Sequence, residues 1–225
     1  MRSNTYVLAF MTTITIVLGT LLSLAATSLK DLQDFNVEID IKKNILKSLD
    51  IPKGSSQKLT SEEIQSLFDE RIKTMLINAD GEESVEGTLP VYVKTDSGVN
   101  SGYAIPISGK GLWSTIYGYL ALNTDGETIK GITFYKHGET PGLGGEVEKE
   151  WFTANFRGKR IVDEEGNLVG IQIAKGQVTT NDPDAYHKVD GISGATMTTK
   201  GVNIFLEQDL ATYDPFLQKL RASEE

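Results

Sequence analysis

Two glycine-containing turns hold residue types that could bind a ligand. The first runs from Asp190 to Thr196 and leads into a predicted helix that begins near Met197. Gly191 and Gly194 allow the backbone to bend tightly and to approach a ligand. The first amides of the following helix have no acceptors within the helix, so they favour an anion such as a phosphate. A Ser/Thr-rich turn before a helix is also a common structural N-cap, and the residues alone favour that simpler interpretation.

The second turn spans residues 138–145 and places Pro141 among several glycines. Pro141 presets a turn, and Gly142 with the Gly144-Gly145 pair permits backbone conformations that other residues avoid. Because the glycines have no side chains, a planar ligand could lie against the backbone there. A hairpin loop without a ligand explains the same residues equally well.

Three other side chains have two interpretations each. Leu112 and Trp113 could form an apolar wall beside a planar ligand or could fill the core, and we favour the core. Lys200 could neutralise a phosphate or be an ordinary surface lysine.

Composition excludes several kinds of chemistry. The chain has no cysteine, so it supplies no thiolate ligand, thiol nucleophile or disulfide, and iron-sulfur clusters are excluded. His137 and His187 lack the spacing of metal ligands, so we predict structural histidines and no metal site. No Gly-x-Gly-x-x-Gly or Gly-Lys-Ser/Thr loop is present. Redox chemistry in this chain would therefore need an organic cofactor.

The N-terminal residues 1–28 are predicted to form a transmembrane anchor. Tyr6 to Ala26 are 21 residues without a charge, long enough for one membrane-spanning helix. A cleaved signal peptide is the alternative, but Leu24–Ser28 offers only a weak cleavage site. Arg2 before the span favours a cytoplasmic N-terminus and an exported remainder. The net charge of −9 argues against a nucleic-acid partner.

Residues 29–88 are predicted to be a helical connecting region that packs on the following domain. Apolar residues roughly keep a helical spacing from Leu29, so the anchor helix should continue to about Leu49. Pro52–Ser56 then interrupts it. Thr60 and Glu63 have the spacing of a capping box, which predicts a second helix over residues 61–77.

Residues 89–225 are predicted to form an α+β domain. Short apolar runs separated by polar turns indicate strands, and hairpin-like connections favour antiparallel pairing. A short helix is expected at residues 151–156, a longer one at 197–209 and a last one from Asp214-Pro215. The predicted fold is an antiparallel sheet flanked by helices, preceded by one transmembrane helix. The expected strands are Val91–Lys94, Tyr103–Ile107, Ile116–Leu122, Ile129–Lys136 and Leu168–Ala174.

Four segments together resemble the FMN-binding domain family, and within it the C subunits of bacterial sodium-translocating NADH:quinone reductases. The Asp190–Thr196 segment is similar to that family's flavinylation motif. The resemblance covers nearly the whole chain, since the other matching segments precede this motif in the expected order. They are Leu32–Asn36 with Ile41–Leu46, then Gly109–Ser114, then Gly138–Glu146.

In that family a separate flavin transferase joins FMN, through its phosphate, to the last Thr of the motif. The resemblance therefore implies that Thr196 carries FMN covalently and is an attachment point, with no catalytic residue in this chain. Asp190 could instead simply cap the turn. The implied transferase-recognition residues are Asp190, Gly191, Ser193, Gly194, Ala195 and Thr196. The implied cofactor contacts are Glu139, Thr140, Leu143, Gly144, Ser193, Gly194, Ala195, Thr196 and Thr199.

The function implied by the resemblance is electron relay within the sodium-pumping NADH:quinone reductase complex of the bacterial inner membrane. The chain would be one subunit of that oxidoreductase, with its FMN domain on the periplasmic or outer face. The other subunits would supply the NADH and quinone sites and the sodium path. Two alternatives remain: the corresponding flavin subunit of the related ferredoxin:NAD electron-transport complex, and a cofactor-free membrane-anchored adaptor.

Overall fold

The computed structural model describes residues 3–51, 59–179 and 181–224. The chain divides into two compact units, residues 1–40 and residues 41–225, and each is described by itself. The division predicted from the sequence, with boundaries after residues 28 and 88, stays a prediction.

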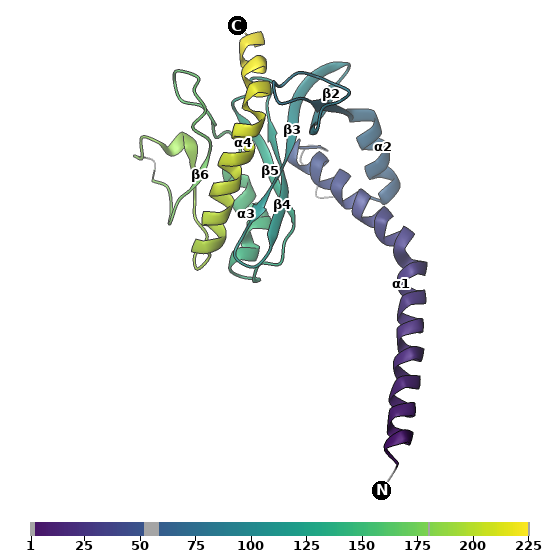
Figure 1. The fold of residues 1–225 in the computed structure, drawn as a ribbon. Helices are drawn as coiled ribbons and strands as arrows, with labels where there is room; N and C mark the ends of the chain where they lie inside the picture. The colour runs from purple at the N-terminus through teal and green to yellow at the C-terminus, as the bar shows by residue number, and fades with distance from the viewer. Residues whose placement is uncertain (1–2, 52–58, 180, 225) are drawn as a thin grey trace. The chain divides into compact units, whose positions relative to one another are not determined.

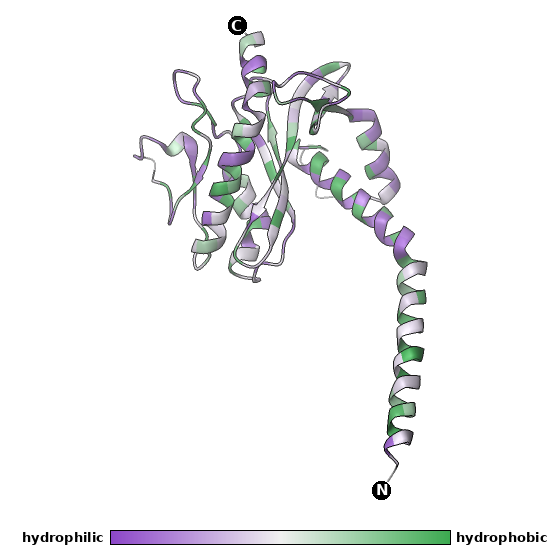
Figure 2. Cartoon of the chain, viewed as in Figure 1, coloured by the Kyte–Doolittle hydropathy of each residue, from purple (hydrophilic) through white to green (hydrophobic). Residues whose placement is uncertain are grey.

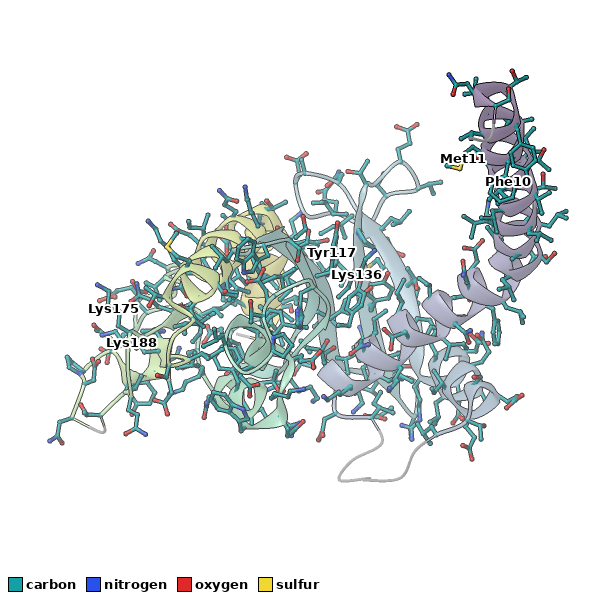
Figure 3. All side chains as sticks on the ribbon, turned by 90° about the horizontal axis from the view of Figure 1, so that it is seen from below. Phe10, Met11, Tyr117, Lys136, Lys175 and Lys188 are labelled. Carbon is teal, nitrogen blue, oxygen red and sulfur yellow. The ribbon has the colours of Figure 1, made fainter. Side chains whose placement is uncertain are left out.

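The first unit is the N-terminal part of one long helix, α1 (Asn4–Ser48), which continues into the second unit. α1 is long and apolar enough to cross a membrane. Figure 2 shows hydrophobic and near-neutral residues along its N-terminal part and hydrophilic residues farther along. The side chains of Phe10 and Met11 are exposed on this part of the helix (Figure 3). α1 ends one residue before the predicted end at Leu49.

The second helix, α2 (Ser61–Arg71), starts at the predicted capping box. The Thr60 hydroxyl accepts a hydrogen bond from the Glu63 amide at 3.3 Å, and the Glu63 carboxylate accepts one from the Thr60 amide at 2.8 Å. The prediction that this helix reaches residue 77 is wrong. Residues 72–77 form strand β1 (Ile72–Ile77), which pairs with strand β2 (Leu89–Asp96), so cross-strand pairing outweighs the local helical pattern.

We expect Thr60→Ala to lower the free energy of unfolding by about 1 kcal/mol, because the Glu63 amide loses its side-chain acceptor. Urea unfolding of the full chain measures the change. Thr60→Ser keeps the hydroxyl and is the control. Equal stability of the Ala and Ser variants would contradict a stabilising cap.

The five strands form one antiparallel sheet in the order β1-β2-β3-β4-β5, which confirms the predicted α+β class. The four strands that were expected between residues 91 and 136 are confirmed, and two of them, β2 and β3, are longer than expected. On neighbouring strands, the Lys136 ammonium lies 5.4 Å from the centre of the Tyr117 ring (Figure 3). The four later strands are β2 (Leu89–Asp96), β3 (Val99–Lys110), β4 (Thr115–Leu122) and β5 (Ile129–Lys136).

Helix α4 (Thr196–Glu224) covers one face of this sheet (Figure 1). The buried side chains of that face alternate along β3, where Tyr103, Ile105 and Ile107 join the core that α4 completes. The Tyr103 ring meets the Phe216 ring of α4 edge to face at 5.6 Å. This contact holds the C-terminal part of α4 against the sheet.

The opposite face of the sheet is covered by residues 41–51 of the second unit. The hydroxyl of Thr133 donates to the Asn44 carbonyl at 3.3 Å, and the Lys94 ammonium donates to the Leu49 carbonyl at 3.4 Å. Gly131 lets this segment approach closely, since a Cβ there would lie 2.5 Å from the Ser48 carbonyl oxygen. This segment therefore covers part of the second face, whereas Thr115 and Tyr117 of the same face remain exposed.

Two predictions for the C-terminal half are wrong. The expected strand at residues 168–174 is reduced to β6 (Gln172–Ile173), which pairs in parallel with β7 (Lys188–Val189) outside the main sheet. Gly170 adopts a positive φ of 74°, which interrupts the extended backbone.

α4 also continues through Pro215, where a new helix was expected. Proline removes one helical hydrogen bond, but packing on both sides of it holds the helix together. Tyr213 and Leu217 are buried, and the Asp214 carboxylate accepts from Arg221 at 2.7 Å.

Between β5 and α4 the chain forms short helices and loops. The predicted short helix at residues 151–156 is present as two consecutive pieces, which bury Phe152 and Phe156 against the sheet. The short elements are η1 (Gly144–Glu148), α3 (Glu150–Thr153), η2 (Ala154–Phe156) and η3 (Ala185–His187).

Candidate functional site

Thr196 is the first residue of α4 and is exposed. The turn before it is held by a hydrogen bond from the Ala195 amide to the Ile192 carbonyl at 3.2 Å, and Gly194 has a φ of 74°. The hydroxyl of Thr199 donates back to the Ala195 carbonyl at 3.1 Å. The Thr196 hydroxyl therefore stands at a well-braced helix start, where unpaired amides favour an anion.

The loop at residues 138–145 lies directly against this turn. A Cβ on Gly194 would come within 2.8 Å of Leu143 Cδ2, so the two predicted ligand-binding turns meet at this glycine. The Thr140 carbonyl accepts the Leu143 amide at 3.1 Å, which closes the loop. Thr140 is exposed and Leu143 is 43% exposed, so both are accessible to a ligand beside Thr196.

Glu139 is the buried centre of the site, with 5% of its surface exposed. Its carboxylate accepts backbone hydrogen bonds from residues 112–114 and a 2.6 Å hydrogen bond from the Thr198 hydroxyl. Burial by itself raises the pKa of Glu139, but the hydrogen bonds from Thr198 and the three amides outweigh it and lower the pKa below its usual value. Glu139 is therefore a carboxylate in the folded protein.

This pKa predicts an acid-dependent stability. Because the folded carboxylate binds a proton less tightly than the unfolded one, its contribution is complete above the unfolded-state pKa and is lost as the pH falls through the folded-state pKa. We expect the difference in unfolding free energy between wild type and Glu139→Gln to shrink between about pH 7 and about pH 3. Urea unfolding across this range measures it. A difference that does not change with pH would contradict the assignment.

The start of the motif supports the loop before it. The Val178 amide donates to the Asp190 carboxylate at 2.7 Å, and the Gly191 amide donates to the Gly176 carbonyl at 2.8 Å. A Cβ on Gly191 would lie 2.2 Å from the Ala174 carbonyl oxygen. The Asp190 carboxylate therefore holds the preceding loop, and both interpretations of its role in the motif stay predictions.

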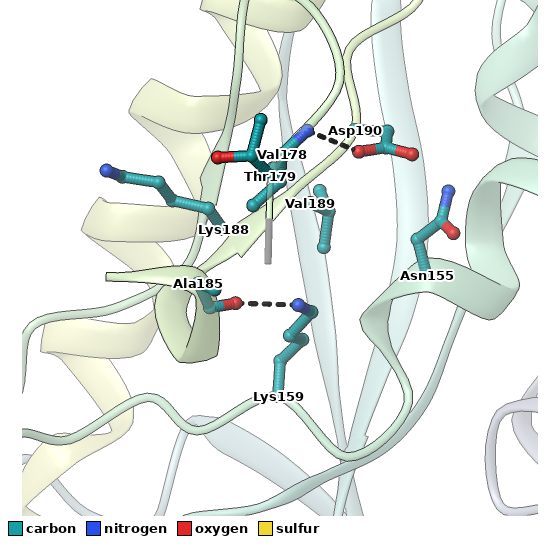
Figure 4. Close-up of a pocket in the computed structure, with 8 residues that line it drawn as sticks. All are labelled: Asn155, Lys159, Val178, Thr179, Ala185, Lys188, Val189 and Asp190. Atoms are coloured by element: carbon teal, nitrogen blue, oxygen red, sulfur yellow. Dashed lines mark hydrogen bonds between the residues drawn. The ribbon is translucent and has the colours of Figure 1, made fainter. Parts of the chain in front are cut away.

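A shallow pocket lies beside Asp190 (Figure 4). The Lys159 ammonium crosses it to donate to the Ala185 carbonyl at 2.6 Å. The remaining lining residues are Asn155, Val178, Thr179, Lys188 and Val189. Lys188 is already paired with Asp182 at 3.0 Å, so its charge is neutralised.

The side chains at positions 112, 113 and 200 lie at the surface. The favoured core position of Trp113 is wrong, because its side chain is 71% exposed, and Leu112 is exposed as well. Both lie on the turn whose amides bind Glu139. Lys200 is exposed near the start of α4.

Both histidines have structural hydrogen bonds, as predicted. The Nδ1 atom of His137 accepts the Glu139 amide at 3.3 Å, and the Nδ1 atom of His187 lies 2.7 Å from the Arg160 carbonyl oxygen. Among the residues that the structure describes, no three metal-binding side chains gather.

Sequence reasoning missed Thr198, which is 2% exposed and contacts Glu139. It also missed Ser114, whose hydroxyl accepts the Gly138 amide at 2.6 Å. Thr198 lies between two motif-proximal threonines, and only its position on the inner side of the first helical turn distinguishes it. That position depends on where the helix begins, which the sequence gives only approximately.

Comparison with known proteins identifies relatives over most of the chain. The model of the FMN-binding domain family matches residues 111–210. The C subunit of the Na(+)-translocating NADH-quinone reductase from Pseudomonas aeruginosa is 34% identical over 89% of this chain and 89% of its own length. The corresponding C subunit from Yersinia pestis is 39% identical over 77% of this chain and 67% of its own length.

Two solved structures of C subunits are also similar to this chain. The crystal structure of the C subunit from Parabacteroides distasonis has a TM-score of 0.72 and 33% sequence identity, and covers 84% of this chain and 96% of its own. Shewanella oneidensis NqrC has a TM-score of 0.68 and 28% identity, with coverage of 81% and 97%. The chain therefore belongs to the family of C subunits of Na(+)-translocating NADH-quinone reductases, which contain an FMN-binding domain.

Proposed function

We propose that this chain carries FMN covalently on Thr196 and relays electrons within a sodium-translocating NADH:quinone reductase. The observation that carries the proposal is the exposed Thr196 hydroxyl at the start of α4, next to the 138–145 loop. The family of the chain supports FMN as the cofactor.

The residues at this place fit a tethered flavin. A phosphodiester on Thr196 would lie at a helix start, where the first amides stabilise its charge. The exposed side chains of Leu143 and Trp113 offer apolar surface to a planar ring, and Thr140 offers a polar group. Thr199 supports the turn through its hydroxyl.

The remaining proposed contacts fall on the same two segments. Ser193 and Gly194 are exposed on the turn, whereas Ala195 is buried beneath it. Gly144 is buried beside Glu139, so its role toward the cofactor is to let the two segments approach. We also propose that a flavin transferase recognises residues 190–196 during maturation.

A bound flavin supplies single-electron chemistry, which suits a carrier between other cofactors. The chain's own residues position the ring, keep it attached and set the charge around it. The donor and acceptor sites, and the sodium path, belong to the other subunits of the complex.

We further propose that α1 anchors the chain in the bacterial inner membrane by a single span. Arg2 before the span supports a cytoplasmic N-terminus and an FMN domain on the periplasmic or outer face.

The proposal is tested by producing the full chain with and without a flavin transferase and recording flavin fluorescence in a denaturing gel. A fluorescent band that depends on the transferase supports covalent attachment. A chain that stays non-fluorescent alongside an active transferase would refute it and would favour a cofactor-free adaptor.

A further inference from the structure

A buried carboxylate joins three segments around the proposed attachment residue. These are the turn at residues 112–114, the 138–145 loop and the first turn of α4. Each Glu139 oxygen accepts two hydrogen bonds: Oε1 from the amides of Trp113 (2.9 Å) and Ser114 (3.2 Å), Oε2 from the Leu112 amide (3.2 Å) and the Thr198 hydroxyl (2.6 Å).

Two glycines leave the space that this carboxylate occupies. A Cβ on Gly111 would lie 2.7 Å from Glu139 Oε1. A Cβ on Gly144 would lie 2.4 Å from the Thr198 hydroxyl oxygen and 2.9 Å from Glu139 Oε2. Any side chain at either position would therefore push the carboxylate off its donors. Gly111 and Gly144 therefore leave room for the Glu139 carboxylate on two sides.

A second hydrogen bond reinforces the same connection. The Gly138 amide donates to the Ser114 hydroxyl at 2.6 Å, so the loop and the turn are joined twice. Both Glu139 oxygens accept hydrogen bonds from within the protein, and the side chain is buried.

We propose that Glu139 is a positioning residue whose carboxylate holds the first turn of α4, and hence Thr196, against the 138–145 loop, and whose charge lowers the midpoint potential of the attached flavin. The electrostatic part rests on the proposed function. Reduction adds negative charge to a flavin, and a buried carboxylate near it opposes that change. Thr198, the hydroxyl partner of Glu139, is two residues from Thr196.

Glutamine has the shape of Glu139 but cannot replace its bonding. Its side chain has one acceptor oxygen and one NH2 group, so at least one of the three backbone amides would face amide hydrogens. Each unsatisfied buried donor destabilises the folded state. Thr198→Val removes one of these donors from the other end of the contact, and Thr198→Ser retains it.

The positioning role is tested without flavin, by a double-mutant cycle on the full chain in detergent. Urea unfolding is measured for wild type, Glu139→Gln, Thr198→Val and the double variant. We expect a coupling of about fivefold or more in the unfolding equilibrium constant, and near wild-type stability for Thr198→Ser. Additive effects of the two substitutions would overturn the positioning role.

The electrostatic role is tested by redox titration of the flavin-carrying chain. We expect Glu139→Gln to shift the midpoint potential to a more positive value, and the exposed control Glu164→Gln to leave it unchanged. Thr198→Ser should keep the wild-type potential. An unchanged potential in Glu139→Gln would overturn this part.

The two tests separate the inference from the proposed function. If wild type acquires no flavin with an active transferase, the proposed function fails, and the electrostatic part fails with it. The unfolding cycle still decides the positioning role, because it uses the chain without cofactor.

Discussion

Thr196→Ala is expected to abolish covalent flavin on this chain completely. The phosphoester needs a free hydroxyl, and the neighbouring threonines cannot supply one. Thr198 is buried and its hydroxyl donates to Glu139, and Thr199 is buried with its hydroxyl donating to backbone carbonyls. The in-gel flavin fluorescence of wild type made with the transferase should therefore disappear in the variant.

Ser193→Ala is the matched control, because Ser193 is exposed on the same turn and also carries a hydroxyl. We expect this variant to keep its fluorescent band, weakened at most by poorer recognition. Persistence of the band in Thr196→Ala, with its loss in Ser193→Ala, would move the attachment point to Ser193.

Gly201→Ala is expected to lower the free energy of unfolding, although alanine is the better helix former. In an exposed helix this substitution would stabilise by about 1 kcal/mol. At Gly201, however, the new Cβ would lie 2.2 Å from the Lys110 carbonyl oxygen, in backbone that cannot rotate away. Overpacking of this kind costs about 3 kcal/mol, so we expect a net loss of about 2 kcal/mol.

Lys200→Ala is the control for Gly201→Ala. Lys200 is exposed and adjacent on the same helix, so its replacement should change the free energy of unfolding by less than about 0.5 kcal/mol. Urea unfolding of the full chain compares the two. Stabilisation by Gly201→Ala would contradict the close approach of α4 to the end of β3.

Elements that depend on local pattern were predictable from the sequence. The capping box at Thr60 and Glu63 places the start of α2 correctly, and strands β2 to β5 lie where short apolar runs alternate with turns. The wrong predictions depend on distant contacts. Strand β1 exists because residues 72–77 pair with β2, and α4 continues through Pro215 because the surrounding side chains are buried or paired.

The candidate site, too, was predictable only where it depends on local sequence. Thr196 and the 138–145 loop were found from glycines, hydroxyl residues and a family motif, all of them local features. The contact between Glu139 and Thr198 joins residues 59 positions apart and gives no sequence signal of its own. The exposure of Trp113 was also not predictable, because an isolated aromatic residue is compatible with both core and surface.

Peptide mass spectrometry tests the central claim most directly. Cleavage after Lys188 and Lys200 releases residues 189–200, which contain Ser193, Thr196, Thr198 and Thr199. For chain made with the transferase, we predict that this peptide gains the mass of FMN less one water and that fragmentation places the addition on Thr196. An unmodified peptide, or an addition on any of the other three hydroxyl residues, would contradict the account.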